Sequence, residues 1–458
     1  MRITAFIETF FRKYLPSPFT IAIILTLITI GVAFFFTPES INGNKFLNVL
    51  SYWEEGIWNT ALLEFAYQMM LILVLGHILV LSRPMNALIL RLTKFATSTV
   101  SAVVLVSVST MLVSFFNWGL GLIFGAILAR KVGEYAQSKS IELNYPLVGA
   151  AGYVGFMIWH SGISGSAPIK VAESGHLKSL MEDFASADII AMLPESINFD
   201  TTIFSYWNLI LFFTLLVVVP FTFVRLAKRT ASTPLSLKSY KFTSNADATE
   251  NDTDKLDHSK PLAIAFGCVI LVAFFYQYYT SLLSLQITPN MLNFFMLGLA
   301  IILHGNFASF LKGVEEAIKG ASGILIQFPL YFGIMGIMKS TGLVVMISDF
   351  FVSIATSTTL PIFTFFSAGL VNIFVPSGGG QWAIQGPIII ESALKLGVPL
   401  PKAIMALAYG DQITNMLQPF WALPLLGITK LKAKEILPYT LILMIVGIFV
   451  YVLGLLIF

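Results

Sequence analysis

Long apolar runs separated by short polar stretches form the main pattern along this 458-residue chain. A helix needs about 20 apolar residues to span the hydrocarbon core of a bilayer. In lipid the backbone must satisfy its own hydrogen bonds, so we expect these runs to form helices. The predicted elements are 17–36, 58–82, 99–130, 146–175, 203–227, 261–281, 289–305, 320–338, 360–395, 401–428 and 436–458.

Two of these runs have polar, glycine-rich centres. The run 99–130 contains FFNWGLGLIFG at 115–125, and the run 360–395 contains PSGGGQW at 376–382. Basic residues stand at both ends of 99–130, and Lys and Arg stay on the cytoplasmic side of a membrane. We therefore predict that 99–130 is a re-entrant hairpin entered from the cytoplasm and that 360–395 is a second one entered from outside.

Two other runs carry polar breaks. Residues 161–168, inside 146–175, read SGISGSAP, and residues 411–419, inside 401–428, read DQITNMLQP. Irregular backbone at membrane depth is tolerated only where protein or a water-filled cavity satisfies it. We therefore predict two broken transmembrane helices whose breaks face the protein interior.

The two halves of the chain share their order of elements. ATST occurs at 96–99 and again at 355–358, and the same spacing places 118–121 over 377–380. The basic segments between the runs give the halves opposite orientations, which predicts an inverted-topology repeat. The predicted domains are an N-terminal half 1–227, a cytoplasmic linker 228–260 and a C-terminal half 261–458.

Composition fixes the broad class. Hydrophobic residues make up 57% of the chain and charged residues 11%, with a mean hydropathy of +0.83, which is typical of an all-α polytopic membrane protein. The net charge of +3 gives no sign of a nucleic-acid partner. The single Cys268 excludes an internal disulfide and a thiolate metal cluster. Arg2 and Arg12 favour a cytoplasmic N-terminus.

The two hairpin tips and the two helix breaks should meet near the middle of the membrane. Free N–H groups at helix ends favour an anion, and free carbonyl groups favour a cation. These four patches contain no Lys or Arg, which favours a small monocarboxylate held by amides, hydroxyls and backbone. The candidate substrate-binding residues are Asn117, Trp118, Gly119, Gly121, Ser161, Ser164, Gly165, Ser166, Ser377, Gly378, Gly379, Gly380, Gln381, Trp382, Asn415 and Gln418.

Asp411 is the acidic residue that the pattern places most firmly at membrane depth, where ionisable groups are rare. It could bind a coupling cation such as Na⁺, carry a proton, or be a structural carboxylate. His160 could carry a proton or be a packed polar residue, and Thr414 is a further coupling-ion candidate. We expect no cofactor and no metal, apart from Na⁺ near Asp411 if that is the coupling ion. His160 and Ser161 are sequence neighbours and so a poor base–nucleophile pair, and we expect no enzyme.

Three segments closely resemble the bacterial short-chain fatty acid transporter family: 116–126 (FNWGLGLIFGA), 372–387 (NIFVPSGGGQWAIQGP) and 408–424 (AYGDQITNMLQPFWALP). The resemblance runs over the whole length and implies uptake of acids such as acetoacetate and butyrate through the inner membrane. It also implies a homodimer in which a transport domain with two hairpins moves, elevator-like, against a scaffold domain. On that basis Asn117 and Ser377 would bind substrate and cation.

The combined prediction is a multi-pass secondary active transporter of short-chain monocarboxylates, coupled to Na⁺ or H⁺. A carrier for dicarboxylates or another small organic anion is an alternative, as is a membrane sensor or a channel without coupled flux. We expect 99–175 and 360–428 to move as one body. The predicted scaffold elements are 17–36, 203–227, 261–305 and 436–458.

Overall fold

The described part of the chain is built from helices. The computed structural model describes residues 9–11, 13–36, 44–182, 187–233, 235, 237, 254–283 and 288–458. Within these residues the strand pairing is limited to one isolated bridge between Leu143 and Thr233. Most of the predicted linker 228–260 lies outside the described residues, as do Arg2 and Arg12, and the predicted domain limits stay predictions.

The predicted apolar runs correspond to single helices or to groups of helices. The helices up to residue 227 are α2 (Pro18–Phe36), α3 (Lys45–Ile57), α4 (Thr60–Leu81), α5 (Arg83–Thr93), α6 (Thr99–Phe116), α7 (Trp118–Ser138), α8 (Tyr145–Ala151), α9 (Ser166–Ala172), α10 (His176–Met181), α11 (Ala187–Ala191) and α12 (Tyr206–Ala227). They are followed by α13 (Asp254–Asp257), α14 (Lys260–Leu283), α15 (Pro289–His304), α16 (Phe307–Ala317), α17 (Ser322–Ser340), α18 (Leu343–Ser353), α19 (Leu360–Phe374), α20 (Gly378–Leu396), α21 (Leu400–Thr414), α22 (Pro419–Thr429) and α23 (Ala433–Ile457).

The run 99–130 is a helical hairpin, as predicted. Helices α6 and α7 are separated by Asn117, whose Oδ1 caps α7 by accepting the Leu120 N–H at 2.9 Å. The two ends of the hairpin return to the same place, because the Asn144 N–H donates to Thr99 Oγ1 at 3.0 Å. The predicted end at residue 130 is too early, since α7 continues to Ser138.

The continuation of α7 past its basic residues has a local cause. Glu134 lies 2.8 Å from Arg130 Nε and 3.0 Å from Lys131 Nζ, so one carboxylate on the same helix face pairs with both cations. Pairs spaced three and four residues apart stabilise a helix. The charges that mark the end of the apolar run therefore lie within the helix.

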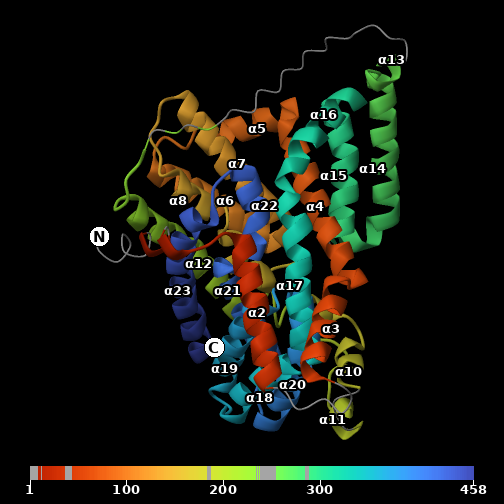
Figure 1. The fold of residues 1–458 in the computed structure, drawn as a ribbon, viewed down its shortest axis with the longest axis vertical. Coiled ribbons are helices and arrows are strands. Elements are labelled where there is room, and N and C mark those ends of the chain that lie inside the picture. The colour runs from red at the N-terminus through yellow and green to blue at the C-terminus, as the bar shows by residue number, and fades with distance from the viewer. Residues whose placement is uncertain are drawn as a thin grey trace.

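The run 360–395 is the second hairpin, made of α19 and α20. Gln381 Nε2 donates to the Ala368 carbonyl at 2.8 Å, and Gln385 Nε2 donates to Ser367 Oγ at 3.1 Å, so the two helices run antiparallel about the PSGGG turn. The two hairpins lie towards opposite ends of the molecule, α6–α7 in the upper part of Figure 1 and α19–α20 in the lower part. Their preceding arms, α5 and α18, follow the same division, as an inverted repeat requires.

Both predicted broken helices are broken. The run 146–175 consists of α8, two short 3₁₀ turns at Val154–Met157 and Trp159–Ser161, and α9. The run 401–428 consists of α21, a 3₁₀ turn at Asn415–Leu417, and α22. Pro419 begins α22, where its missing N–H costs no hydrogen bond.

Helices α12 and α23 pack on the hairpins, which differs from the scaffold predicted at 203–227 and 436–458. Asn208 of α12 donates to the Ser161 carbonyl at 3.0 Å and accepts the Tyr409 hydroxyl proton at 2.7 Å. Tyr451 of α23 accepts from Gln412 Nε2 at 2.8 Å. A separate group forms where α17 packs along α2 and α3 and where α15 packs between α4 and α14.

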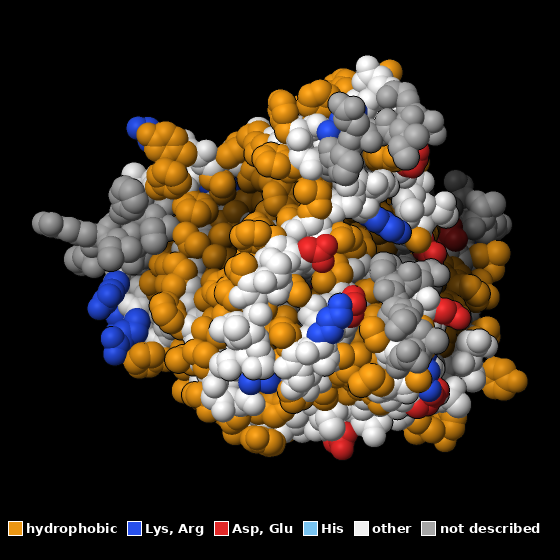
Figure 2. All heavy atoms as spheres, turned by 90° about the horizontal axis from the view of Figure 1, so that it is seen from below, with side chains coloured by type: hydrophobic (Ala, Val, Ile, Leu, Met, Phe, Trp, Pro, Cys, Tyr) orange, Lys and Arg blue, Asp and Glu red, His pale blue; other side chains and the backbone are white. Residues whose placement is uncertain are grey.

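Much of the outer surface is apolar. Figure 2, which views the end that carries α10 and α18, shows hydrophobic side chains over large areas with few charges among them. Among the residues that the structure describes, seven helices are long and apolar enough to span a membrane, namely α2, α4, α6, α12, α14, α17 and α23. Side chains on such helices are open to the surroundings, with Val217 69% and Tyr276 87% exposed. Apolar surface exposed to this extent is typical of a protein that lies in a membrane.

Candidate functional site

The break in 146–175 is where the other three patches meet. The Trp118 N–H, at the first hairpin tip, donates to Ser164 Oγ at 2.9 Å. At the second tip, a Cβ placed on Gly378 would lie 2.9 Å from His160 Cε1, so this backbone lies directly against the histidine ring. Asp411, from the break in 401–428, contacts the same ring. The convergence that the sequence predicts is therefore present.

His160 and Asp411 form a buried pair. Nδ1 of His160 lies 3.3 Å from Oδ1 of Asp411, and both residues are fully buried. His160 Nε2 accepts the Ala167 N–H at 3.0 Å, so the proton of the neutral ring lies on Nδ1, although its contact with the carboxylate does not have the geometry of a hydrogen bond. No hydrogen-bond partner within the described residues reaches either oxygen of Asp411. Burial of a carboxyl group without hydrogen-bond partners is costly, which marks Asp411 as a candidate for binding a cation or a proton.

Gln412 holds the histidine in place. Its Oε1 accepts the backbone N–H groups of His160 at 2.9 Å and Ser161 at 3.2 Å. Its Nε2 donates to the hydroxyls of Tyr451 at 2.8 Å and Ser161 at 3.3 Å, and Tyr451 donates to the Met157 carbonyl at 2.7 Å. The 3₁₀ turn before the break cannot pair these N–H groups itself, so the Gln412 side chain replaces a missing helical partner.

Replacing Gln412 with leucine should destabilise the protein, because it leaves two buried N–H groups unpaired at about 1–3 kcal/mol each. We expect a clearly lower midpoint of thermal unfolding for the purified protein in detergent. Tyr451→Phe removes both hydrogen bonds of the Tyr451 hydroxyl but leaves the N–H groups of His160 and Ser161 paired, so it should have a smaller effect. Equal midpoints for Gln412→Leu and the unmodified protein would show that other contacts hold the break.

Asn372 of α19 is a site residue that the sequence patterns do not mark. Its Nδ2 lies 2.8 Å from the Asp411 carbonyl, 2.9 Å from Thr414 Oγ1 and 2.7 Å from Asn415 Oδ1. Gln418 Nε2 donates to the Asn372 carbonyl at 2.6 Å. Asn372 thus ties the second hairpin to the second break, and it occupies polar groups of three predicted site residues. An amide inside an apolar run was the signal that could have found it.

The tip of the second hairpin keeps free donors. Ser377 Oγ caps α20 by accepting the Gly380 N–H at 3.2 Å. The N–H groups of Gly378 and Gly379 have no acceptor within the part of the chain that the structure describes, as the first turn of a helix allows. Gly379 is exposed, and Ser166 Oγ lies 4.0 Å from the point where its Cβ would be. The positive end of α20 and a neighbouring hydroxyl can therefore receive an anion.

The first hairpin tip is closed on itself. Asn117 is buried, and its side chain is engaged as the cap of α7. A Cβ on Gly121 would overlap Ser114, so this glycine allows α6 and α7 to approach closely. Gly119 lies beside Asn117 Oδ1. This tip has fewer free donors than the second tip.

Aromatic side chains form one wall beside the breaks. The ring of Trp118 lies 5.3 Å from that of Trp421 and 5.9 Å from that of Trp159, measured between ring centres. Trp118 is half-buried, whereas the other two are buried. Such a wall favours a short apolar tail next to the polar tip.

Three other predicted residues take structural positions. Ser161 Oγ donates to the Ile158 carbonyl at 3.0 Å, and a Cβ on Gly165 would overlap the His160 carbonyl. Trp382 is turned away from the tip, and its Nε1 donates to Nε2 of His176 in α10 at 3.0 Å. Trp382 therefore joins the second hairpin to α10.

The contact between Trp382 and His176 should depend on pH. Burial lowers the pKa of His176, an effect that Glu173 opposes. The neutral ring, which can accept the Trp382 N–H, is thus favoured by folding. The neutral His176 ring stabilises the fold fully above pH 6.5, which is about the pKa of histidine in an unfolded chain. This stabilisation is lost as the pH falls through the lower pKa that His176 has in the folded protein. We expect His176→Gln to reduce the loss of thermal stability on acidification through this window, and an unchanged loss would contradict the contact.

Gly378→Ala should impair transport without unfolding the protein. The added methyl would lie 2.8 Å from Trp159 Cη2 and 2.9 Å from His160 Cε1, which forces two buried rings to shift. Overpacking of this kind costs roughly 1–3 kcal/mol, and we expect uptake to fall by about tenfold or more. Gly31→Ala on α2, with open space around the new methyl, is the matched control. Equal uptake by Gly378→Ala and Gly31→Ala, at equal protein amounts, would show that the second hairpin tip is not closely packed against these rings.

Comparison with known proteins identifies the chain. The model of the family described as short chain fatty acid transporter matches residues 1–458. The chain belongs to this family. A relative from Escherichia coli (strain K12), named as a short-chain fatty acid transporter, is 34% identical over 463 residues, which cover 100% of this chain and 99% of that protein. A relative of the same name from Haemophilus influenzae (strain ATCC 51907 / DSM 11121 / KW20 / Rd) is 33% identical over 99% of each chain.

Two solved transporter structures are more distantly similar to this short-chain fatty acid transporter. The Alcanivorax borkumensis YdaH transporter is 14% identical, with a TM-score of 0.42 over 96% of this chain and 98% of that one. Neisseria gonorrhoeae MtrF is 15% identical, with a TM-score of 0.40 over 97% and 96%. Likeness at this level carries over neither function nor site residues. The family itself establishes a multi-pass membrane transporter rather than an enzyme.

Proposed function

We propose that this transporter moves a short-chain monocarboxylate across the bacterial inner membrane together with a proton. The observation that carries the proposal is the position of Gly378. Within the described residues, the Gly378 N–H is one of the unpaired donors at the first turn of α20. The Gly378 Cα lies against the ring of His160, which contacts Asp411. A carboxylate at the tip and a proton on the pair would be close enough to reduce each other's cost of burial.

The substrate carboxylate would bind at the first turn of α20, between Gly378, Gly379 and Ser166. Backbone N–H groups and hydroxyls suit one carboxylate, whereas a second would need further cationic groups, and the tips and breaks contain no Lys or Arg. The aromatic wall around Trp118 would limit the length of the apolar tail. These features favour acids such as butyrate or acetoacetate over dicarboxylates.

A proton suits the pair better than Na⁺. Sodium prefers several oxygen ligands, but the ionisable group in contact with the Asp411 carboxylate is His160 Nδ1, a nitrogen that carries the hydrogen of the neutral ring. The carbonyl of Asn372 already accepts from Gln418, and Thr414 Oγ1 already accepts from Asn372. We therefore propose Asp411 as the proton carrier, with His160 as the group that stabilises its ionised state.

We propose an elevator-type motion in which α6–α9, α12 and α19–α23 form the moving body. These helices share the polar contacts of the site, and the group around α17, α15 and α4 would form the scaffold. The homodimer stays a prediction. The cytoplasmic N-terminus likewise stays a prediction.

Uptake of labelled butyrate into proteoliposomes tests the proposal, with a pH gradient and a Na⁺ gradient imposed separately. We expect saturable uptake driven by an inwardly directed proton gradient and unaffected by Na⁺. Unlabelled acids of two to six carbons should compete, and succinate should not. Uptake driven by Na⁺ alone would overturn proton coupling, and the absence of saturable uptake of any such acid would overturn the substrate class.

A further inference from the structure

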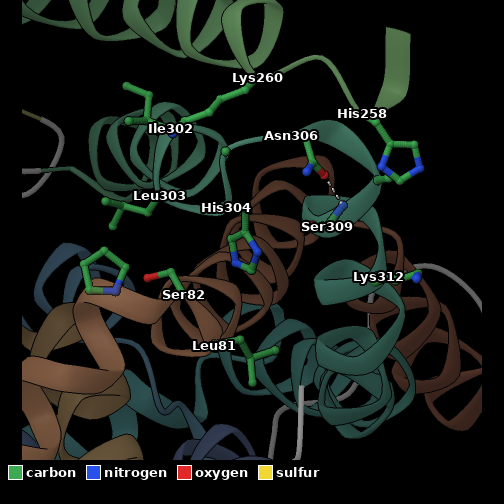
Figure 3. Close-up of a pocket in the computed structure, with 13 residues that line it drawn as sticks. Leu81, Ser82, His258, Lys260, Ile302, Leu303, His304, Asn306, Ser309 and Lys312 are labelled. Carbon is green, nitrogen blue, oxygen red and sulfur yellow. Dashed lines mark hydrogen bonds between the residues drawn. The ribbon is translucent and has the colours of Figure 1, made fainter. Parts of the chain in front are cut away.

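A cavity of about 460 Å³ lies away from the hairpin tips and breaks, where α4, α14, α15 and α16 come together (Figure 3). It includes the last residue of α4 and the first residues of α14 and α16. In Figure 1 these helix ends lie in the upper part of the molecule, together with α5. The predicted cytoplasmic segments lie at this end, so the cavity stands at the inner boundary of the membrane.

The cavity is lined by basic and hydrogen-bonding groups. Lys260, Lys312, His258 and His304 all contribute. Among the residues that the structure describes, no carboxylate lines the cavity, although Asp257 precedes His258 in the chain. His304 is held by Nε2, which donates to the Ile78 carbonyl at 2.9 Å. This wall of the cavity is therefore fixed.

The first turn of α16 adds a polarised helix end to the same cavity. Asn306 caps this 11-residue helix by accepting the Ser309 N–H at 2.7 Å, a contact drawn in Figure 3. Asn306, Ala308 and Ser309 all line the cavity. The positive end of the helix dipole and two lysines thus act on one space, which favours an anion.

The surroundings favour a lipid over a soluble anion. The lining also contains Leu81, Ile302 and Leu303, and the adjoining α14 presents apolar side chains outward, with Val269 62% and Val272 69% exposed. An anion with acyl chains could place its phosphate among the lysines and its chains along α14. Basic pockets between helices on the cytoplasmic side of a membrane bind anionic headgroups in this way.

We propose that this cavity binds the phosphate headgroup of an anionic phospholipid. The bound lipid would hold together the helix ends of α4, α14, α15 and α16. These helices belong to the group proposed not to move, so the site is separate from the substrate site and does not depend on the substrate proposed above.

Lipid binding to the purified, delipidated protein tests this proposal by native mass spectrometry and thermal unfolding. We expect phosphatidylglycerol to bind and to raise the unfolding midpoint more than phosphatidylcholine does. The variant Lys260→Gln with Lys312→Gln should bind phosphatidylglycerol about tenfold more weakly, with phosphatidylcholine unaffected. Ala308→Leu fills the cavity and keeps every charge, and it should weaken phosphatidylglycerol binding to the same extent. This variant separates binding inside the cavity from long-range attraction by the lysine charges.

Lys319→Gln with Lys395→Gln is the matched control. These lysines lie outside the cavity and pair with Glu316 and Glu391, so phosphatidylglycerol affinity should not change. Glycerol 3-phosphate, which has the charge but no acyl chains, should not raise the midpoint. Equal affinity for phosphatidylglycerol and phosphatidylcholine would overturn the proposal, as would an equal loss of phosphatidylglycerol affinity in the two double variants. An unfolding midpoint raised as much by glycerol 3-phosphate as by phosphatidylglycerol would also overturn it, in favour of a soluble anion.

Discussion

Asp411→Asn should abolish proton-driven uptake while exchange of substrate across the membrane continues. The amide has nearly the shape of the protonated acid, and the Asp411 carboxyl makes no hydrogen bond within the described residues that the change would remove, so the break should keep its structure. It cannot gain or lose a proton, and accumulation against a gradient should fall by at least about tenfold. Counterflow of labelled against unlabelled butyrate, measured in the same proteoliposomes, needs no net proton movement and should persist.

The control for this prediction is Asp349→Asn on α18, an exposed acid away from the pair. It should leave both uptake and counterflow unchanged. Accumulation that remains fully dependent on the pH gradient in Asp411→Asn would assign the proton to another group. Loss of counterflow together with accumulation would instead indicate that Asp411 is structural.

Gly410→Ala should be strongly destabilising. A Cβ at this position would overlap the backbone carbonyl of Phe365, because α19 and α21 touch there along their backbones. Backbone cannot rotate aside as a side chain can, so the helices would have to separate. Overpacking costs about 1–3 kcal/mol where side chains adjust, and we expect at least the upper end of this range.

The expected result is a large fall in the thermal midpoint of the purified protein, or failure to recover folded protein at the normal expression temperature. Separation of α19 and α21 would also pull Asn372 away from Asp411 and Asn415, so any folded fraction should transport poorly. Gly31→Ala is again the control, and a midpoint for Gly410→Ala equal to that of Gly31→Ala would contradict the close approach.

The sequence predicts the hairpins and breaks because their signals are local. Glycine and proline interrupt apolar runs at 376–382, and basic residues on both sides of 99–130 allow only a path that turns back. The continuation of α7 beyond residue 130 also has a local cause, because Glu134 lies on the same helix face as Arg130 and Lys131 and pairs with both. A charge count alone ends that helix too early.

Contacts between distant segments account for the rest of what sequence reasoning missed. Asn372 and Gln412 lie inside recognised motifs, but their importance comes from partners on other helices. The placement of α12 with the hairpins depends on Asn208, which meets Ser161 and Tyr409 from across the fold. Apolar helices with one polar residue look alike in sequence, and only the packed structure shows which body each one joins.

Substrate protection of a cysteine at the second hairpin tip tests the central claim most directly. In a Cys268→Ser background, Ser166→Cys places a thiol beside Gly379, and Ser138→Cys places one on the exposed end of α7 as a control. Butyrate should slow modification of the first thiol by a water-soluble thiosulfonate, with half-maximal protection at the concentration that half-saturates uptake, and should not affect the second. Modification at Ser166→Cys that is independent of butyrate, in protein that still transports it, would contradict a carboxylate site at this tip.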